Sequence, residues 1–518
     1  MNYYVIGIGG TGAKCTEALV HLCAAGLMPD GELYALFVDP DTANGNLERA
    51  GITLQQYINC RGLNYGRTEL LRTRVTAAKP NAWSPFENQT HPSLENFFYY
   101  NTLKVSDKPA AHLFDVLYSN AEKQTPLEKG FRGHPSIGAA VMAETVKLGE
   151  DEPWQTFRTK VMQDIRGGTG AKIFLFGSIF GGTGASGFPT IAKLIYDELK
   201  KLQEKEKSKK ELQEREKIKL ELENIKLGGA LILPYFSFIY HDSTEADKIE
   251  LKAKSEDFLI TTQAGLKYYC QKYKDAIYNA IYLLGDEAQS AVSTTSLGGN
   301  TQKNEAHFIE FYAALSAIDF FTKENPQNYH LIARKGKKEL DWDDLPDNNG
   351  GRIVREKIGQ LIRFAFAYLS VYYPMLEDIR KSGKGYRSPW FIDLFERENI
   401  SLNDSSTQAS LNNMKDYCES FLLWIANLHH SARGESINLI KWDTFAKVMR
   451  EDEVEKVGLL KNFGLKDFCN VIMPLKKERP NELSELWEWM SSGKAQDSNA
   501  VGIGKFISAL YLGCKLKE

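Results

Sequence analysis

Residues 173–192 decide the fold of this chain and read IFLFGSIFGGTGASGFPTIA. The apolar run Ile173–Ile179 predicts a buried strand, and the glycines after it predict a tight loop. Pro189 suits the first turn of a helix, where its missing N–H removes no helical hydrogen bond. A strand, a glycine loop and a helix in succession are typical of an α/β fold with a mostly parallel sheet.

The same alternation recurs through the first half of the chain. Tyr3–Ile8 is an apolar strand that runs into glycines, and Thr11–Leu27 has helical spacing. Apolar runs predict further strands at residues 33–38, 227–238 and 276–284, and helical spacing predicts further helices at 136–147, 353–375, 414–430 and 504–512. We therefore expect flanking helices on a parallel sheet, followed after about residue 350 by a largely helical region.

Composition narrows the class of protein. The chain has 518 residues, is 43% hydrophobic and carries a formal net charge of −3, so overall charge gives no nucleic-acid signal. Its seven cysteines include no C-x-x-C pair, which disfavours a disulfide framework and a structural zinc site. No signal peptide and no apolar stretch of membrane-spanning length is recognisable. We expect a soluble, cytoplasmic protein without a membrane span.

The first glycine loop, Gly7–Lys14, reads GIGGTGAK and lies between a strand and a helix. Glycines let the backbone approach phosphate oxygens, and a helix N-terminus offers free N–H groups and the positive end of its dipole. With Asp39 following, the loop also fits a dinucleotide-binding Rossmann fold. A tight turn without ligand is the third interpretation.

The second glycine loop, Gly181–Gly187, also joins a strand to a helix. A dinucleotide fold needs one such loop, whereas two are expected when a polyphosphate lies across several strand ends. Thr183 and Ser186 add hydroxyl donors. A similar string, Gly167–Gly170, does not follow an apolar strand, and we interpret it as an unrelated loop.

Residues 176–192 resemble the signature loop of the tubulin/FtsZ superfamily, and the resemblance extends in chain order over roughly residues 1–350. The first glycine loop lies where that family has its first phosphate loop. Further similarities occur at residues 37–44, in the loop after the second strand; at 133–140, in the third loop; at 230–238, in the strand after the signature helix; and at Ala306-His307, near the start of the long central helix.

The resemblance implies a GTPase that binds GTP or GDP with Mg²⁺. The nucleotide-binding residues it implies are Gly9, Gly10, Thr11, Gly12, Lys14, Asp39, Gly133, His134, Gly181, Gly182, Thr183, Gly184, Ala185, Ser186, Asn304 and His307. Mg²⁺ on phosphate oxygens needs no dedicated protein site. Asp39 and Asp41 are candidates for its outer ligands or for ribose contacts, or they belong to a turn that ends the strand.

An acidic string at Glu339–Leu345 reads ELDWDDL. The resemblance places Asp341 and Asp344 at the family's catalytic spacing, in a loop that acts on the nucleotide of the next subunit in a head-to-tail filament. A carboxylate near the attacking water would serve as base or anchor. The alternative is an ordinary acidic surface loop.

The expected organisation has three parts. Residues 1–300 form the nucleotide-binding domain, with a charged insertion at 200–224; residues 301–350 hold the central helix and the acidic loop; residues 351–518 form an α-rich C-terminal domain. The insertion mixes both signs of charge with few apolar residues, which favours a solvated helix or loop over a coiled-coil arm.

Several residues depart from the family pattern and bear on base selectivity. Lys14 replaces a polar residue that contacts the base, and it is long enough to reach phosphate. Phe180 and Ser186 replace small residues. His307 lies near the base-reading position, where packing is the alternative.

Two other functions stay open beside a self-assembling GTPase. One is a nucleotide-binding switch or scaffold that does not polymerise, for example in phage defence, and the altered C-terminal third motivates it. The other is a dinucleotide-dependent oxidoreductase, which leaves the second glycine loop unexplained.

Overall fold

The computed structural model describes most of the chain. The described residues are 1–78, 82–87, 92–131, 133–148, 150–207, 225–238, 258–272, 277–286, 290–292, 299–323, 329–331, 340–345, 351–383, 387–431, 438–446, 449–450, 453–457, 471–473, 483–493 and 499–516. Most of the predicted charged insertion and Glu339 lie outside them.

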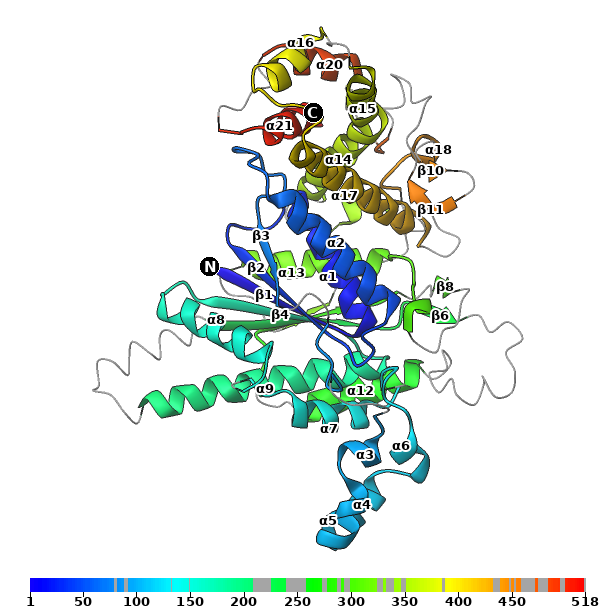
Figure 1. Ribbon diagram of the computed structural model, residues 1–518. Helices are drawn as coiled ribbons and strands as arrows, with labels where there is room; N and C mark the ends of the chain where they lie inside the picture. Colours follow the sequence, from blue (N-terminus) through cyan, green and yellow to red (C-terminus); the bar gives the residue numbers. More distant parts are fainter. Residues whose placement is uncertain are drawn as a thin grey trace.

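A seven-stranded sheet forms the centre of the molecule, with strand order β3-β2-β1-β4-β5-β7-β9 (Figure 1). Every neighbouring pair in it is parallel. The strands are β1 (Asn2–Ile8), β2 (Glu32–Val38), β3 (Arg74–Ala77), β4 (Ala171–Ser178), β5 (Ile225–Ile232), β7 (Ala280–Leu284) and β9 (Tyr329–Leu331). The predicted α/β fold with a parallel sheet is confirmed.

Helices cover both faces of this sheet, as a parallel sheet requires. On one face lie α1 (Gly9–Ala24), α2 (Gly45–Arg61) and α13 (Phe308–Thr322); on the other lie α7 (Pro135–Thr145), α8 (Trp154–Arg166), α9 (Gly182–Lys207) and α12 (Phe258–Lys272) (Figure 1). Side chains of β1 alternate between the two cores: Tyr3 and Val5 enter the first, and Tyr4 and Ile6 enter the second.

The C-terminal region is largely helical, as predicted. Its main helices are α14 (Arg352–Ala367), α15 (Tyr373–Ser382), α16 (Pro389–Phe391), α17 (Ser405–His430), α18 (Trp442–Phe445), α20 (Leu483–Ser491) and α21 (Ile503–Gly513). A π-helical turn, Tyr368–Tyr372, joins α14 to α15. The described residues of this region pack into the same core as α1, α2 and α13 (Figure 1).

Four short helices form an arm between β3 and α7. They are α3 (Leu94–Phe97), α4 (Tyr100–Ser106), α5 (Lys108–Leu117) and α6 (Asn120–Gln124). Figure 1 shows α4 and α5 at the end of the molecule farthest from the C-terminal region. The sequence predicted neither the helices nor the projection.

Several boundaries differ from the prediction. The helix after the second glycine loop begins at Gly182 and contains Pro189, so the glycines form its first turn. The strand predicted at 227–238 is interrupted at Pro234, which leaves β5 and the short β6 (Phe236–Phe238). The central helix α13 has 15 residues. None of the helices in the described ranges is long and apolar enough to cross a membrane.

Candidate functional site

Three glycine loops meet at the carboxyl edge of the sheet, where β1 and β4 end. A Cβ atom on Gly9 would lie 3.3 Å from Cβ of Thr183, so the first and second loops touch. A Cβ on Gly182 would lie 2.8 Å from the backbone nitrogen of Gly133, which brings in the third loop. Gly9 also has a φ of 71°, which disfavours any side chain there. The sequence predicted the first two loops at strand ends of one sheet, and the third loop was expected from the resemblance.

Three helices begin at this junction, and their first turns carry no acidic residue: α1, α7 and α9. No side chain caps α1 at Ile8 or α7 at His134. The first N–H groups of a helix have no partner within it, and its dipole is positive at that end. Uncapped N-termini that converge in this way suit an anion with several negative charges.

Two other helix N-termini nearby, those of α2 and α13, have a side-chain cap and an acidic residue in the first turn. Asn44 caps α2 and Glu48 lies in its first turn. His307 caps α13 and Glu310 completes a capping box. Because side chains already satisfy these two helix starts, α1, α7 and α9 are the helix starts here that remain candidates for binding an anion.

The G-G-T-G string at residues 167–170 lies at the end of β4 opposite to the second glycine loop. Gly167–Gly170 ends helix α8, with the backbone N–H and hydroxyl of Thr169 both donating to the carbonyl of Asp164, at 3.1 and 3.0 Å. A helix C-terminus carries the negative end of the dipole and repels anions. Its position at the C-terminus of α8, away from the three glycine loops, agrees with the prediction that this string is an unrelated loop.

Most of the predicted phosphate-loop residues lie in the loops and first turns that form the junction: Gly9, Gly10, Thr11, Gly12, Gly133, His134, Gly181, Gly182, Thr183 and Gly184. Ser186 and Ala185 differ. The Ser186 hydroxyl donates to the carbonyls of Gly182 at 2.8 Å and Thr183 at 3.1 Å, and the Ala185 N–H donates to Gly181 at 3.1 Å. Both donors are used within α9, so neither is free for a phosphate.

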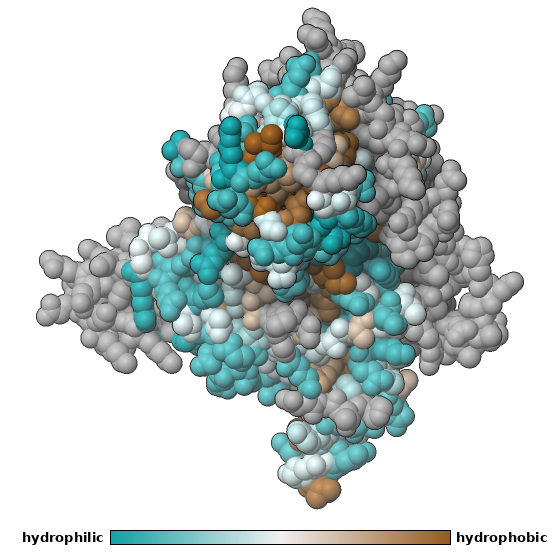
Figure 2. Space-filling model, turned by 45° about the horizontal axis from the view of Figure 1, so that its top comes forward, coloured by the Kyte–Doolittle hydropathy of each residue, from teal (hydrophilic) through white to brown (hydrophobic). Residues whose placement is uncertain are grey.

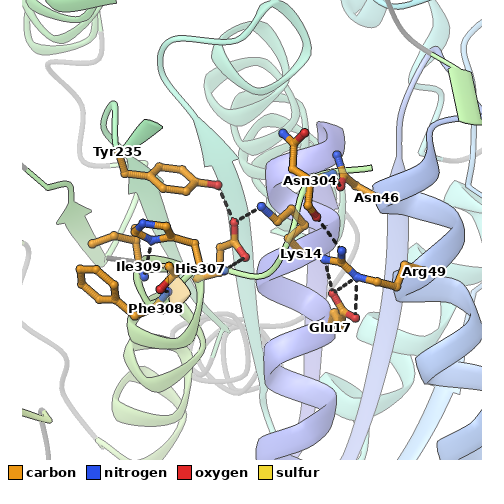
Figure 3. Close-up of polar contacts among 11 residues, drawn as sticks. Lys14, Glu17, Asn46, Arg49, Tyr235, Asn304, His307, Phe308 and Ile309 are labelled. Atoms are coloured by element: carbon orange, nitrogen blue, oxygen red, sulfur yellow. Dashed lines mark hydrogen bonds and ion pairs between the residues drawn. The ribbon is translucent and has the colours of Figure 1, made fainter. Parts of the chain in front are cut away.

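Lys14 does not point into the phosphate junction. It is 3% exposed, and its ammonium forms an ion pair with Glu310 at 2.5 Å (Figure 3). The Tyr235 hydroxyl donates to the same carboxylate at 2.5 Å. The predicted contact of Lys14 with phosphate or base is corrected, because a buried charge must be paired and its partner comes from α13.

His307 acts as a structural cap. Its Nδ1 accepts the backbone N–H of Ile309 at 3.1 Å, and its own N–H donates to Glu310 at 2.9 Å. Its ring stacks on Phe308 and packs against Tyr235 (Figure 3). Burial, followed by the nearby Lys14 charge, lowers the pKa of His307 well below its usual value, so the imidazole is neutral. These contacts match the packing alternative for His307.

Glu17, one turn beyond Lys14 on α1, ties this helix to α2. Arg49 donates to both carboxylate oxygens of Glu17 at 2.9 Å and, through Nη1, to the carbonyl of Asn304 at 2.6 Å (Figure 3). A bidentate arginine–carboxylate pair fixes orientation as well as charge. Arg49 therefore holds the segment 299–306 against α1 and α2.

Amide side chains complete this attachment. Asn46 Oδ1 accepts the N–H of Asn304 at 2.7 Å, and Asn44 Nδ2 donates to Gln302 at 3.1 Å. A Cβ on Gly10 would lie 3.2 and 3.3 Å from the amide nitrogens of Asn44 and Asn46, so these amides border the first phosphate loop. The segment around Asn304 thus lies beside the junction, as predicted.

The site residues that sequence reasoning missed are Glu17, Asn46, Arg49, Tyr235 and Glu310. Asn44-Gly45-Asn46 follows a strand that ends at the carboxyl edge, which is where ligands bind in open α/β sheets. That rule could have identified Asn46. The roles of the other four residues depend on contacts with partners that are distant in the sequence, so no local pattern indicates them.

Asp39 is a buried carboxyl at the end of β2. One of its oxygens accepts the N–H of Asp41 at 3.1 Å, and burial raises the pKa of Asp39 to about 8. Asp41 accepts the N–H groups of Ala43 at 3.2 Å and Gly299 at 2.6 Å. Asp41 therefore orders the loop, while Asp39 is a buried carboxyl group that holds its proton up to about pH 8.

The described residues contain no group of three or more His, Cys, Asp or Glu side chains that could hold a metal ion. A Mg²⁺ ion bound to phosphate oxygens keeps several water ligands and needs no such group. Asp39 is suited to such an ion, since a divalent cation would stabilise its charged form.

The acidic turn lies away from the position that action in trans requires. Helix α13 ends at the amino edge of the sheet, where Lys172 at the start of β4 donates to the carbonyls of Phe320 and Phe321, at 3.3 and 2.8 Å. Strand β9 then runs parallel to β7 and returns the chain toward the carboxyl edge. There Tyr312, in the second turn of α13, donates to the carbonyl of Asp344 at 2.6 Å.

Asp341 and Asp344 cap each other's turn. Asp341 accepts the N–H of Asp343 at 2.9 Å, and Asp344 accepts the N–H of Asp341 at 3.0 Å, around a short 3₁₀ helix, Trp342–Asp344. Subunits stacked head to tail touch through opposite faces, so acids that act in trans belong at the amino edge. The expected position is therefore corrected, because the sequence string did not reveal that β9 reverses the path of the chain.

Removing the Lys14 charge should destabilise the fold more than it affects ligand contacts. We expect Lys14→Met to lower the free energy of unfolding by about 3–5 kcal/mol, because the Glu310 carboxylate is then buried without a compensating positive charge. The double variant Lys14→Met/Glu310→Gln should recover most of that loss. Urea unfolding of both variants measures this, and equal losses in the two would contradict a buried ion pair.

Asp39 should make stability depend on pH. Its folded pKa is about 8 and its unfolded pKa is about 3.9, so between these values the folded chain holds a proton that the unfolded chain has lost. This contribution is fully present below about pH 4 and is lost as the pH rises through about 8. With divalent cations chelated, Asp39→Asn should gain stability over the wild type between about pH 5 and about pH 9 in urea unfolding. If the unfolding free energies of the wild type and Asp39→Asn change in parallel with pH, the pKa of Asp39 is not raised in the folded chain.

Comparisons with known proteins leave the family open. No protein-family model and no curated protein matches the chain. Among solved structures, a GTPγS-bound protofilament of CetZ2 from Haloferax volcanii matches with 15% sequence identity and a TM-score of 0.26. The match covers 62% of this chain and 60% of that protein. A similarity this low establishes neither family nor function.

Proposed function

We propose that this chain binds a nucleoside triphosphate with Mg²⁺ where its three glycine loops meet, and that the nucleotide is GTP. The observation that carries the proposal is the convergence of three acid-free helix starts, α1, α7 and α9. A triphosphate brings several negative charges that these N-termini would share. The choice of guanine follows from the resemblance to the tubulin/FtsZ superfamily.

The site geometry favours a triphosphate over a dinucleotide. A dinucleotide fold places one pyrophosphate on one helix N-terminus and an acid on the ribose. Gly9 and Asp39 would satisfy that arrangement, but the contacts of Thr183 with Gly9 and of Gly182 with Gly133 would have no role in it. The oxidoreductase interpretation is therefore the weaker one.

The nucleoside would extend from the phosphates toward Asn46 and Asn304. Asn46 borders Gly10, and Asn304 is held by Asn46 and by Arg49, the partner of Glu17 on α1 (Figure 3). An amide presents a donor and an acceptor together, which suits either ribose hydroxyls or the edge of a purine. Asp39, at the end of the neighbouring strand, would lie on the Mg²⁺ side.

A second candidate function is a GTP-binding switch that does not assemble into filaments. The position of Asp341 and Asp344 favours it over the filament hypothesis, because these acids lie toward the carboxyl edge and cap their own turn. Hydrolysis by head-to-tail assembly would need other groups at the amino edge. Any hydrolysis by single subunits would depend on positioning and on charge stabilisation at the three loops.

The G-G-T-G string occurs at residues 9–12, 167–170 and 181–184, and the copy at 167–170 provides a matched control for the binding site. We expect Thr183→Glu to weaken GTP binding by at least about 100-fold, because it places a carboxylate among the phosphates. A glutamate in the first turn of α9 suits the helix dipole, so folding should be preserved. Isothermal titration with GTP and Mg²⁺ measures the loss.

Thr169→Glu is the control, since it makes the same change in the string at the other end of β4. It should bind GTP within about twofold of the wild type, as expected of an exposed change away from the site. Equal losses in the two variants, or an unchanged affinity in Thr183→Glu, would remove the proposed site.

The filament hypothesis and the switch that does not assemble differ in how GTP hydrolysis depends on protein concentration. We expect GTPase activity per molecule to stay constant from about 1 to about 20 µM, because the acidic turn does not face a following subunit. Asp341→Asn should leave that rate unchanged. Activity that rises with concentration and is lost in Asp341→Asn would restore the filament mechanism.

A further inference from the structure

Asn46 is a buried amide beside the first phosphate loop. Polar side chains cover much of the described surface (Figure 2), but Asn46, in the first turn of α2, is 3% exposed. A Cβ atom on Gly10 would lie 3.3 Å from its Nδ2, so the lack of a side chain at Gly10 lets this amide approach the start of α1. Because buried polar groups are ordinarily hydrogen-bonded, the partners of the two halves of the amide indicate its role.

The acceptor half of the Asn46 amide is already in use. Its Oδ1 accepts the backbone N–H of Asn304 at 2.7 Å, and the backbone N–H of Asn46 donates to the carbonyl of Gln302 at 3.1 Å. Since an oxygen must face the N–H of Asn304, the nitrogen Nδ2 is the atom turned toward Gly10. The segment 299–306 therefore fixes the orientation of this amide without a ligand.

The donor half of the Asn46 amide has no acceptor in the described part of the chain. None of the residues that the structure describes accepts a hydrogen bond from Nδ2. The neighbouring Asn44 differs, because its Nδ2, 3.2 Å from the same Cβ position, donates to Oε1 of Gln302 at 3.1 Å. A buried donor without an acceptor is destabilising, so it favours a ligand that supplies the acceptor.

The surroundings of the amide leave its donor for such a ligand. Figure 3 shows the amides of Asn46 and Asn304 side by side at the N-terminal end of α1, beyond the ion pair of Glu17 and Arg49. Arg49 donates to both oxygens of Glu17 at 2.9 Å, so that carboxylate is already compensated. The group that Asn46 can serve therefore lies on the side of the first phosphate loop.

We propose that Asn46 Nδ2 donates a hydrogen bond to an oxygen of the bound nucleotide, on its phosphates or its ribose, beside the first phosphate loop. The inference rests on the proposed nucleotide binding and adds a contact from α2 to those from α1, α7 and α9. A side chain makes this contact, since Asn44 already caps the α2 helix start. A neutral amide with only its donor available selects an acceptor by hydrogen-bond direction, whereas helix N-termini attract by charge.

Two substitutions at Asn46 separate this contact from a structural role. Asn46→Asp keeps an oxygen for the N–H of Asn304 but turns a carboxylate oxygen toward Gly10, so we expect GTP affinity to fall at least about 100-fold. Asn46→Leu removes both halves of the amide without adding charge, so we expect a loss of about tenfold. A merely structural role predicts the reverse order, because leucine and not aspartate releases Asn304.

Isothermal titration with GTP and Mg²⁺ measures the affinities, and urea unfolding without nucleotide measures the stability of each variant. We expect Asn46→Asp to be at least as stable as Asn46→Leu, because an acid in the first turn of α2 suits the helix dipole. Titration with inorganic triphosphate identifies the acceptor. A loss in Asn46→Asp that persists with this probe indicates a phosphate oxygen, and a loss confined to GTP indicates a ribose oxygen.

Gln55→Glu is the matched control, since it makes the same change from amide to carboxylate at an exposed position of α2, where Gln55 donates to Asn59. It should bind GTP within about twofold of the wild type. The inference would be overturned, with the proposed function left standing, if Asn46→Asp bound GTP as the wild type does, bound it more tightly than Asn46→Leu, or were the less stable of the two variants. A wild type that binds no nucleotide would overturn both.

Discussion

The buried polar face of α1 is the constraint on which the site depends. Lys14, Glu17 and His21 follow one another at spacings of three and four residues, and each is at most 3% exposed. Each has a partner on a different element: Glu310 on α13, Arg49 on α2 and Tyr417 on α17. Charges buried without partners would cost more than the fold could tolerate, so these contacts fix the rotation and height of α1.

The position of α1 in turn sets the first phosphate loop, because the helix begins at Gly9 without a capping side chain. The contact of Gly9 with Thr183 then aligns the start of α9, and that of Gly182 with Gly133 aligns the third loop. At its other end α1 meets α17, where the His21 ring packs against Trp424 at 4.7 Å between ring centroids. Burial lowers the pKa of His21 to about 4, so this contact is made by a neutral ring. The C-terminal region thus braces the helix that carries the phosphate loop.

Local patterns in the sequence predicted the parts of the molecule that depend on local physics. Apolar strands followed by glycines predicted β1, β4 and their loops, and the presence of two such loops predicted a polyphosphate that lies across several strand ends. The roles of Lys14 and Ser186 could not be predicted, because one depends on a partner contributed by α13 and the other on where α9 begins. Asp341 and Asp344 matched a spacing, but their place in the molecule depends on Tyr329–Leu331, a strand with only three residues to signal it.

The central claim is that the three loops together bind one guanosine triphosphate. The most direct measurement equilibrates the purified chain with Mg²⁺ and an equimolar mixture of GTP, ATP and NAD, removes free ligand, and identifies by mass what the protein retains. The account predicts GTP, with its hydrolysis product GDP, at about one nucleotide per chain. Retention of NAD, or of no nucleotide by a folded chain, would contradict it.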